Sequence, residues 1–246
     1  MQGSVFTGIN YFFRGMMLLK TPGLRRFIII PLATNILLFA LLGAAVYGYV
    51  SQWYEATLSW LPDWLDFLSW ILAPILWLLA GLLTGYVSTL IVLILTSPFH
   101  ALLAEKVEEQ VTGEPVPALE GLGAALLQLP RGILRELSKL IYYLPMALAL
   151  FILSFIPLLN TAAPALWFLL GAWMMSLQFA DYPMDNHRLS FRAVREVCAR
   201  RRLSSLGFGA IVALVAGIPL VNLVVIPAAV AGATLFWCEE GRQAAS

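Results

Sequence analysis

Charged side chains are scarce in this sequence. They make up 12% of its 246 residues, whereas hydrophobic residues make up 61%. A soluble domain of this length needs far less apolar surface to fill one core, so the composition predicts a membrane protein. The formal net charge of +1 also lacks the clustered positive excess that a phosphate backbone requires, which argues against a nucleic-acid partner.

Residues that commonly carry out chemistry are also few. The lysines are Lys20, Lys106 and Lys139, and none follows a glycine, so the chain has no Walker-type phosphate loop and is not an ATPase subunit. His100 and His187 lie far apart in sequence and have no cysteine partners, which leaves a metal site without support. No GxSxG motif is present. We therefore expect no enzyme activity, no catalytic residues, no metal and no cofactor.

The cysteines, Cys198 and Cys238, are isolated and form no CxxC pair. Cys198 lies in an arginine-rich segment, which the positive-inside tendency assigns to the cytoplasm, so we expect both as reduced thiols. The N-terminus lacks a basic region followed by a compact apolar core and a small-residue cleavage site. No cleavable signal peptide is expected.

Long uncharged runs are what the sequence does have. Residues 27–54 carry no charged side chain, and this run exceeds the roughly 20 residues that cross a bilayer. Residues 71–96 form a second such run, which returns the chain to the first side. The helix containing the second run is expected to continue past Pro98 until Gly113 ends it. The connector is rich in tryptophan, which is typical of the aromatic belt at a membrane surface.

The segment before the first run has its own periodicity. Between Val5 and Met17, large apolar residues recur at spacings of three and four. This pattern predicts an amphipathic helix that lies in the membrane interface. Packing of the same helix on the rest of the protein is an equally open interpretation, and the two are compatible.

Charged residues concentrate in three later segments. Residues 104–120 and 131–139 mix acidic and basic side chains, and we interpret both as a solvated cytoplasmic face. Arg188, Arg192 and Arg195 fall on one helical face within the third segment. They indicate either a cytoplasmic anchor or a funnel that attracts an anion toward the membrane.

An internal repeat occupies the last hundred residues. FIPLLNTAAPALWFLLGA and GIPLVNLVVIPAAVAGAT share an Ile-Pro-Leu-x-Asn core that is followed by another proline. The apolar sequence before each turn is interrupted or too short to span, so each copy predicts a helical hairpin that enters and leaves the bilayer on one side. Such broken backbone needs protein or a water-filled cavity around it. Asn160 and Asn222 therefore either cap the turns or line a polar path.

Four strings carry a resemblance to a known family. They are GINYFFRGMMLLKTPGLRRFIIIPLATNILLF, SPFHALLAEKVE, DYPMDNHRLSFRAVR and IPLVNLVVIPAAVAGAT, in this order from Gly8 to Thr234. The chain closely resembles the CysZ family of bacterial sulfate permeases. The resemblance implies a multi-pass protein of the bacterial inner membrane that takes up sulfate for cysteine biosynthesis without an ATPase partner. It also implies homo-oligomers in the lipid bilayer, including assemblies with antiparallel subunits.

The fold that the resemblance implies is an all-α integral membrane protein. It has an amphipathic N-terminal helix, two long transmembrane helices and two hairpins that penetrate only part of the bilayer. The expected boundaries are a single membrane domain, 1–246, with an interfacial helix at 1–20, transmembrane helices at 24–54 and 71–112, and hairpins at 140–180 and 203–238.

The family's sulfate site lies at a Gly-Leu-Arg motif, which here is Gly23, Leu24 and Arg25, with Arg26 beside it. A helix N-terminus offers unpaired N–H groups and about half a positive elementary charge. Gly23 lets the backbone approach an anion closely, and the two arginines supply planar donor forks for a tetrahedral oxyanion. On the residues alone, anchoring of the helix at the lipid surface also explains the arginine pair.

Orientation and mechanism stay open at this point. The positive charge predicts a cytoplasmic N-terminus, which would turn an uptake site inward unless oligomers contain both orientations. Transport through a channel and transport by alternating access are both compatible with the sequence. The alternatives from other classes are a non-transporting membrane scaffold or membrane-shaping protein, and a lipid-modifying enzyme.

Overall fold

The computed structural model describes residues 3–58, 69–116, 129–218 and 221–245. All regular elements within these ranges are helical, and no strand occurs among them, which confirms the all-α class. The chain divides into two compact units. One contains residues 1–28 with 98–246, and the other contains residues 29–97. The single membrane domain expected from the sequence stays a prediction.

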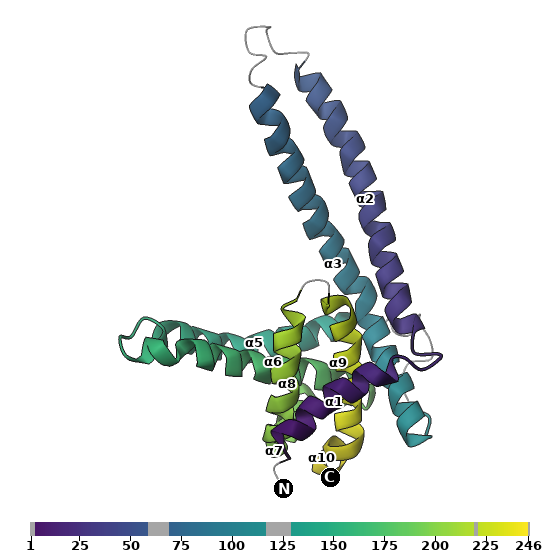
Figure 1. Cartoon of the computed structure of the whole chain (residues 1–246), viewed down its shortest axis with the longest axis vertical. Coiled ribbons are helices and arrows are strands. Elements are labelled where there is room, and N and C mark those ends of the chain that lie inside the picture. The colour runs from purple at the N-terminus through teal and green to yellow at the C-terminus, as the bar shows by residue number, and fades with distance from the viewer. Residues whose placement is uncertain (1–2, 59–68, 117–128, 219–220, 246) are drawn as a thin grey trace. The chain divides into compact units, whose positions relative to one another are not determined.

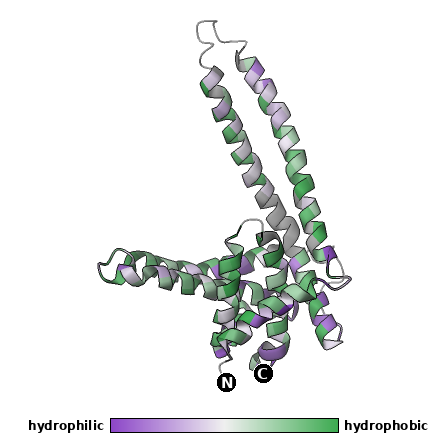
Figure 2. Ribbon diagram, in the orientation of Figure 1, coloured by the Kyte–Doolittle hydropathy of each residue, from purple (hydrophilic) through white to green (hydrophobic). Residues whose placement is uncertain are grey.

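The unit of residues 29–97 consists of most of α2 (Arg26–Leu58) and the first part of α3 (Ser69–Thr112). Among the described side chains, none is buried in the apolar 18-residue window of Leu32–Ala56. Figure 2 shows hydrophobic residues along this helix. Tyr47 of α2 stacks on Trp77 of α3, with ring centroids 5.0 Å apart. Because so much apolar surface faces outward, these helices need lipid or another chain around them.

Within the described ranges, four helical stretches are long and apolar enough to cross a membrane. They are Leu32–Ala56, Arg131–Leu153, Leu159–Asn186 and Val224–Ala245. The predicted second span, 71–96, includes side chains outside the described residues, and its described part contains the shorter apolar stretch Ala73–Ser88. The chain is a membrane protein. The expected partial penetration of the hairpins stays a prediction, because length and composition do not fix the depth of a helix.

The larger unit contains both copies of the repeat. The first copy joins α5 (Leu129–Leu153) to α6 (Ala163–Asn186) through the short helix η2 (Leu159–Ala162). The second joins α8 (Arg202–Ala216) to α9 (Asn222–Phe236). Figure 1 shows the helices of each pair side by side, and residues of both pairs are in contact. The chain is completed by α7 (Phe191–Arg200), η3 (Trp237–Gly241) and α10 (Arg242–Ala245).

Helix α1 (Val5–Leu18) packs against α8 and α9. The contact is close enough to require glycine, since a Cβ on Gly15 would lie 2.4 Å from the backbone nitrogen of Gly232. Tyr11 and Phe12 are buried on this face, whereas Phe6 and Met17 are exposed. The helix therefore packs on the protein and still presents apolar side chains outward, which fits the two compatible interpretations of its periodicity.

Helix α3 continues through Pro98 and ends at Thr112, in agreement with the expected end. Gly113 follows with a φ of 73°, the left-handed conformation that often terminates a helix. The last turns of α3 belong to the larger unit and place Leu103, Ala104 and Val107 in its core. Glu108 of the same turns is thereby brought against His187 at the end of α6 and against Trp237 and Arg242 near the C-terminus.

Candidate functional site

The turn between α1 and α2 holds the predicted sulfate motif. Gly23 has a φ of 96°, a conformation that strongly favours glycine. A Cβ at this position would meet nothing within 4 Å, so the backbone is open on that side. Leu24 and Phe27 are buried, at 4% and 8% exposure, and pack in the hydrophobic core. Two apolar side chains thus fix the backbone of the Gly23–Arg26 turn (Gly23, Leu24, Arg25 and Arg26).

Both arginines of this turn are exposed. Arg25 donates from Nε to the carbonyl oxygen of Lys20 at 2.9 Å, and the guanidinium carbon of Arg26 lies 5.1 Å from the centroid of the Phe27 ring. Among the described residues, neither guanidinium pairs with a carboxylate. The turn therefore presents two uncompensated positive charges where α2 begins, at the end of a helix that favours anions.

The predicted polar-path residues lie at the turns of the two repeats. Asn160 is exposed within η2, and its backbone N–H donates to the carbonyl of Ile156 at 3.0 Å. Asn222 begins α9, and its side chain lies outside the described residues. No hydrogen bond between described residues joins Asn160 to the Gly23–Arg26 turn. The assignment of the two asparagines to a polar path stays a prediction.

A buried ion-pair network joins α5 to α6. Arg135 donates from Nε to both carboxylate oxygens of Asp181 at 2.8 Å, and from Nη1 to Asp185 at 2.7 Å. Lys139 lies 2.8 Å from Asp181, and Arg131 donates to Asp185 at 2.9 Å. The basic residues are spaced at four residues on α5 and the acidic residues at four on α6, so each set lies on one face of its helix. We call these five residues the α5–α6 network.

This network corrects the sequence interpretation of residues 131–139 as a solvated face for Arg135 and Lys139, whereas the side chains of Arg131 and Glu136 are 39% and 59% exposed. Lys139 is 4% exposed, and the side chain of Arg135 is 9% exposed. The charges are buried because each finds an opposite charge on the other helix, and such compensation is what makes burial of an ion tolerable. The sequence signal that could have predicted this network is the matching four-residue spacing of basic residues in α5 and of acidic residues in α6. Ionisable residues in such helices commonly mark functional positions.

A second buried charge lies on α3. Glu108 is fully buried, and its Oε1 accepts hydrogen bonds from Trp237 Nε1 at 3.2 Å and from Arg242 Nη2. His187 Nε2 lies 2.7 Å from the same oxygen. The sequence interpretation of residues 104–120 as solvated is therefore wrong for Glu108, and also for Glu105 at 7% exposure. We call Glu108, His187, Trp237 and Arg242 the Glu108 cluster.

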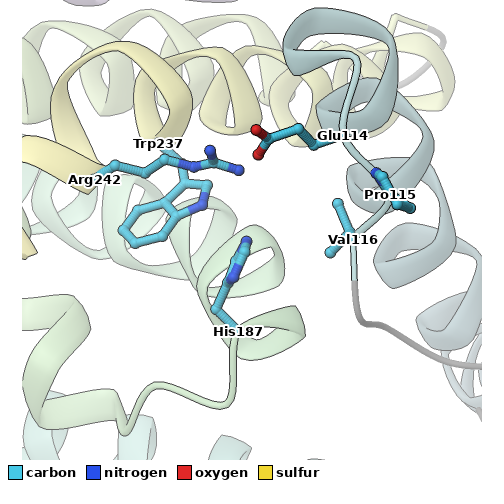
Figure 3. Close-up of a pocket in the computed structure, with 6 residues that line it drawn as sticks. All are labelled: Glu114, Pro115, Val116, His187, Trp237 and Arg242. Atoms are coloured by element: carbon cyan, nitrogen blue, oxygen red, sulfur yellow. The ribbon is translucent and has the colours of Figure 1, made fainter.

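A pocket of about 400 Å³ opens beside the Glu108 cluster. Figure 3 shows the side chains of Arg242 and Glu114 reaching toward each other across it, with the Trp237 ring next to Arg242. The pocket carries charges of both signs, which suits it less to a dianion than the Gly23–Arg26 turn. Within the described ranges, no group of three or more histidine, cysteine or acidic side chains could hold a metal ion.

The two cysteines are free. Cys198 is completely buried, and burial raises the pKa of its thiol to about 12. The thiol is therefore protonated at neutral pH and is a poor nucleophile. A role for Cys198 in packing explains its position better than a role in chemistry.

The chain is similar in sequence to known proteins. A family model described as sulfate transporter CysZ/etoposide-induced protein 2.4 matches residues 11–227. A protein of Pseudomonas fluorescens (strain Pf0-1) named sulfate transporter CysZ is 44% identical over 241 residues, covering 98% of this chain and 96% of that protein. A protein of the same name from Vibrio cholerae serotype O1 is 41% identical over 244 residues, covering 98% and 96%.

A third protein with this name, from Pectobacterium atrosepticum, is 39% identical over 237 residues and covers 96% of this chain and 86% of the relative. The resemblance seen in the sequence strings is thus confirmed over nearly the whole chain. The family is one of transporters, in agreement with the expectation that the protein is not an enzyme. The chain belongs to the sulfate transporter CysZ/etoposide-induced protein 2.4 family.

Proposed function

We propose that the protein is a sulfate transporter of the bacterial inner membrane, that it binds sulfate at the Gly23–Arg26 turn, and that the sulfate supplies cysteine biosynthesis. The names of the relatives support the substrate. The observation that carries the site is the pair of exposed arginines at the start of α2, which have no carboxylate partner among the described residues. Sulfate is a dianion at neutral pH, so a site for it needs donors and positive charge rather than a proton acceptor.

The rigidity of the turn supports this site over a simple lipid anchor. An anchoring arginine needs only a flexible side chain that reaches the headgroups. Here Gly23 adopts a left-handed conformation, and Leu24 and Phe27 are buried on either side of Arg25 and Arg26. A fixed backbone lowers the entropic cost of ordering the donors around an anion. The arrangement therefore favours recognition of a compact oxyanion, with anchoring as a compatible second role.

A homo-oligomer with subunits in opposite orientations fits the same account. None of the described side chains in the apolar 18-residue window of Leu32–Ala56 is buried, so partner subunits could cover part of α2. Antiparallel subunits would place one Gly23–Arg26 turn at each surface of the membrane. This arrangement would resolve the conflict between sulfate uptake and the cytoplasmic N-terminus that the positive charge predicts.

Uptake of labelled sulfate into proteoliposomes tests the proposal. Wild-type protein is expected to accumulate sulfate above the level of empty liposomes. The double variant Arg25→Gln with Arg26→Gln is expected to lose this uptake, because both guanidinium charges are removed. Arg202→Gln is the matched control, since Arg202 is also exposed but lies at the start of α8. Wild-type uptake no faster than in empty liposomes would contradict transport itself.

A membrane-shaping role is the second candidate. It is favoured by α1, which is held against α8 and α9 while Phe6 is 83% exposed and Met17 is 65% exposed. Such side chains could insert into one leaflet like a wedge. Vesicles that change curvature with the protein but accumulate no sulfate would support this role over transport.

A further inference from the structure

An apolar groove of about 760 Å³ lies between α5 and α7, apart from the Gly23–Arg26 turn and the Glu108 cluster. Its walls include Ile141, Tyr142, Pro145 and Met146 of α5, and Phe191 and Arg195 of α7. Tyr142 and Phe191 meet edge to face, with centroids 5.9 Å apart, and tie the two helices together. Hydrophobic side chains thus line most of this preformed groove, and arginine side chains also lie in its wall.

Arg195 supplies a positive charge in the wall of this groove and packs over two aromatic rings. The guanidinium carbon of Arg195 lies 4.6 Å from the Tyr142 ring centroid and 5.6 Å from the Phe191 ring centroid. Its Nε is buried and has no hydrogen-bond partner within the described part of the chain. Arg192 also lines the groove and donates from Nε to Glu196 at 3.0 Å. Because both Arg192 and Arg195 line the groove, a ligand that places an anionic oxygen there would be stabilised by their positive charge.

The groove joins an apolar segment to a polar one. Ile141, Pro145 and Met146 lie within Arg131–Leu153, one of the stretches that can cross a membrane, and Ile141 is 64% exposed. The arginines belong to α7, a helix outside these stretches that buries Val194 and Val197 on its other face. A ligand lying along the groove would place its apolar part beside α5 and its charged part beside α7. This is the polarity of a lipid at a membrane surface.

We propose that the groove binds one anionic phospholipid, with its phosphate at Arg192 and Arg195 and an acyl chain against Ile141, Pro145 and Met146. The apolar walls distinguish this ligand from a free oxyanion, because sulfate would gain nothing from them. The arginines distinguish it from an uncharged lipid. Glu196 reduces the positive charge near Arg192, so it tunes the affinity for the phosphate.

Native mass spectrometry of the full-length protein, titrated with phosphatidylglycerol or phosphatidylcholine, tests this site. The wild type is expected to bind phosphatidylglycerol more tightly, by about fivefold for each contributing arginine. Arg192→Gln with Arg195→Gln should reduce its affinity to that for phosphatidylcholine, and Glu196→Gln should raise it. Arg188→Gln is the matched control and should leave both affinities unchanged.

Two further variants separate lipid binding from loss of structure. Arg195→Lys keeps the charge and should retain the preference for phosphatidylglycerol, whereas Met146→Trp should fill the groove and weaken both lipids. Circular dichroism and size-exclusion chromatography establish that each variant is folded. Equal wild-type affinity for the two lipids would overturn the proposal. So would an Arg192→Gln, Arg195→Gln variant that binds phosphatidylglycerol normally or that loses sulfate binding instead.

Discussion

The guanidinium of Arg135 faces the carboxylate of Asp181 across α5 and α6, with Nε 2.8 Å from both carboxylate oxygens. Both side chains are buried, at 9% and 5% exposure. Removing one member of a buried pair costs up to about 3–5 kcal/mol of folding free energy. Without Arg135, Asp181 keeps only Lys139 as an ion-pair partner among the described residues, and Asp185 keeps only Arg131. Arg135→Ala is therefore expected to destabilise the protein strongly, as measured by thermal unfolding in detergent.

A matched control separates the pair from the surrounding packing. Arg131→Ala should have a smaller effect, because the Arg131 side chain is 39% exposed and its one ion-pair partner among the described residues is the partly exposed Asp185. Replacing Arg135, Lys139 and Asp181 together with leucine should restore much of the loss, since the buried members of the network are removed together. A triple variant as unstable as Arg135→Ala would contradict this explanation.

Close packing of α1 gives a second prediction. A Cβ on Gly15 would lie 2.4 Å from the Gly232 nitrogen and 2.5 Å from the Ala228 carbonyl oxygen. Gly15→Ala must therefore push α1 away from α9, and overpacking of this kind typically costs about 1–3 kcal/mol. Gly171→Ala is the control, because a Cβ there meets nothing within 4 Å. Equal melting temperatures for the two variants would show that α1 is not packed in this way.

The third prediction concerns the dependence of stability on pH. The His100 ring packs edge-on against Tyr182, and its Nδ1 is buried without a hydrogen-bond partner among the residues that the structure describes. Burial lowers the pKa of its imidazole to about 4. The unfolded chain, with an ordinary histidine pKa of about 6.5, therefore binds more protons between these two values. His100 thus contributes stability that is complete above the unfolded pKa and is lost as the pH falls toward 4.

His100→Gln is expected to reduce the fall in melting temperature between pH 7.5 and pH 4.5, chosen as about one pH unit above the ordinary pKa and just above the lowered one. Carboxylates titrate in the same range, so the informative quantity is the difference between the wild type and the variant. If the two proteins lose stability in parallel over this range, His100 is not the group responsible.

The fourth prediction concerns thiol reactivity. Burial raises the pKa of Cys198 to about 12, so its thiolate is rare at neutral pH. In a Cys238→Ser background, N-ethylmaleimide should modify Cys198 very slowly until the protein is unfolded. The control places a cysteine at the adjacent exposed position, as Ala199→Cys with Cys198→Ser and Cys238→Ser. Similar alkylation rates at positions 198 and 199 would mean that Cys198 is accessible.

The fold class was predictable because the residues that decide it are contiguous. The uncharged run of residues 27–54 can only be a buried or membrane-embedded segment, and Gly113 marks the end of α3 without reference to the rest of the chain. The same holds for the Gly23–Arg26 turn, where Pro22 and Gly23 precede the arginines. Local sequence was sufficient for these features because their backbone conformation depends on neighbouring residues.

The buried charges could not be predicted in the same way. Arg135 and Asp181 are 46 residues apart in sequence, and Glu108 and Arg242 are 134 apart. Whether such residues face water or each other depends on which helices pack together, and a single sequence does not fix that. The same reason explains why the burial of Tyr11 and Phe12 could not be predicted. Both residues belong to α1 and are buried, although the periodicity of this helix also fits a membrane surface.

Equilibrium binding of labelled sulfate to the purified protein tests the central claim, that sulfate is held at the Gly23–Arg26 turn. Hydrogen bonds to charged groups contribute about 1.5–3 kcal/mol each, so Arg25→Gln with Arg26→Gln should weaken binding by at least about a hundredfold. The Arg202→Gln variant should bind like the wild type. Unchanged sulfate affinity in the folded double variant would contradict the account.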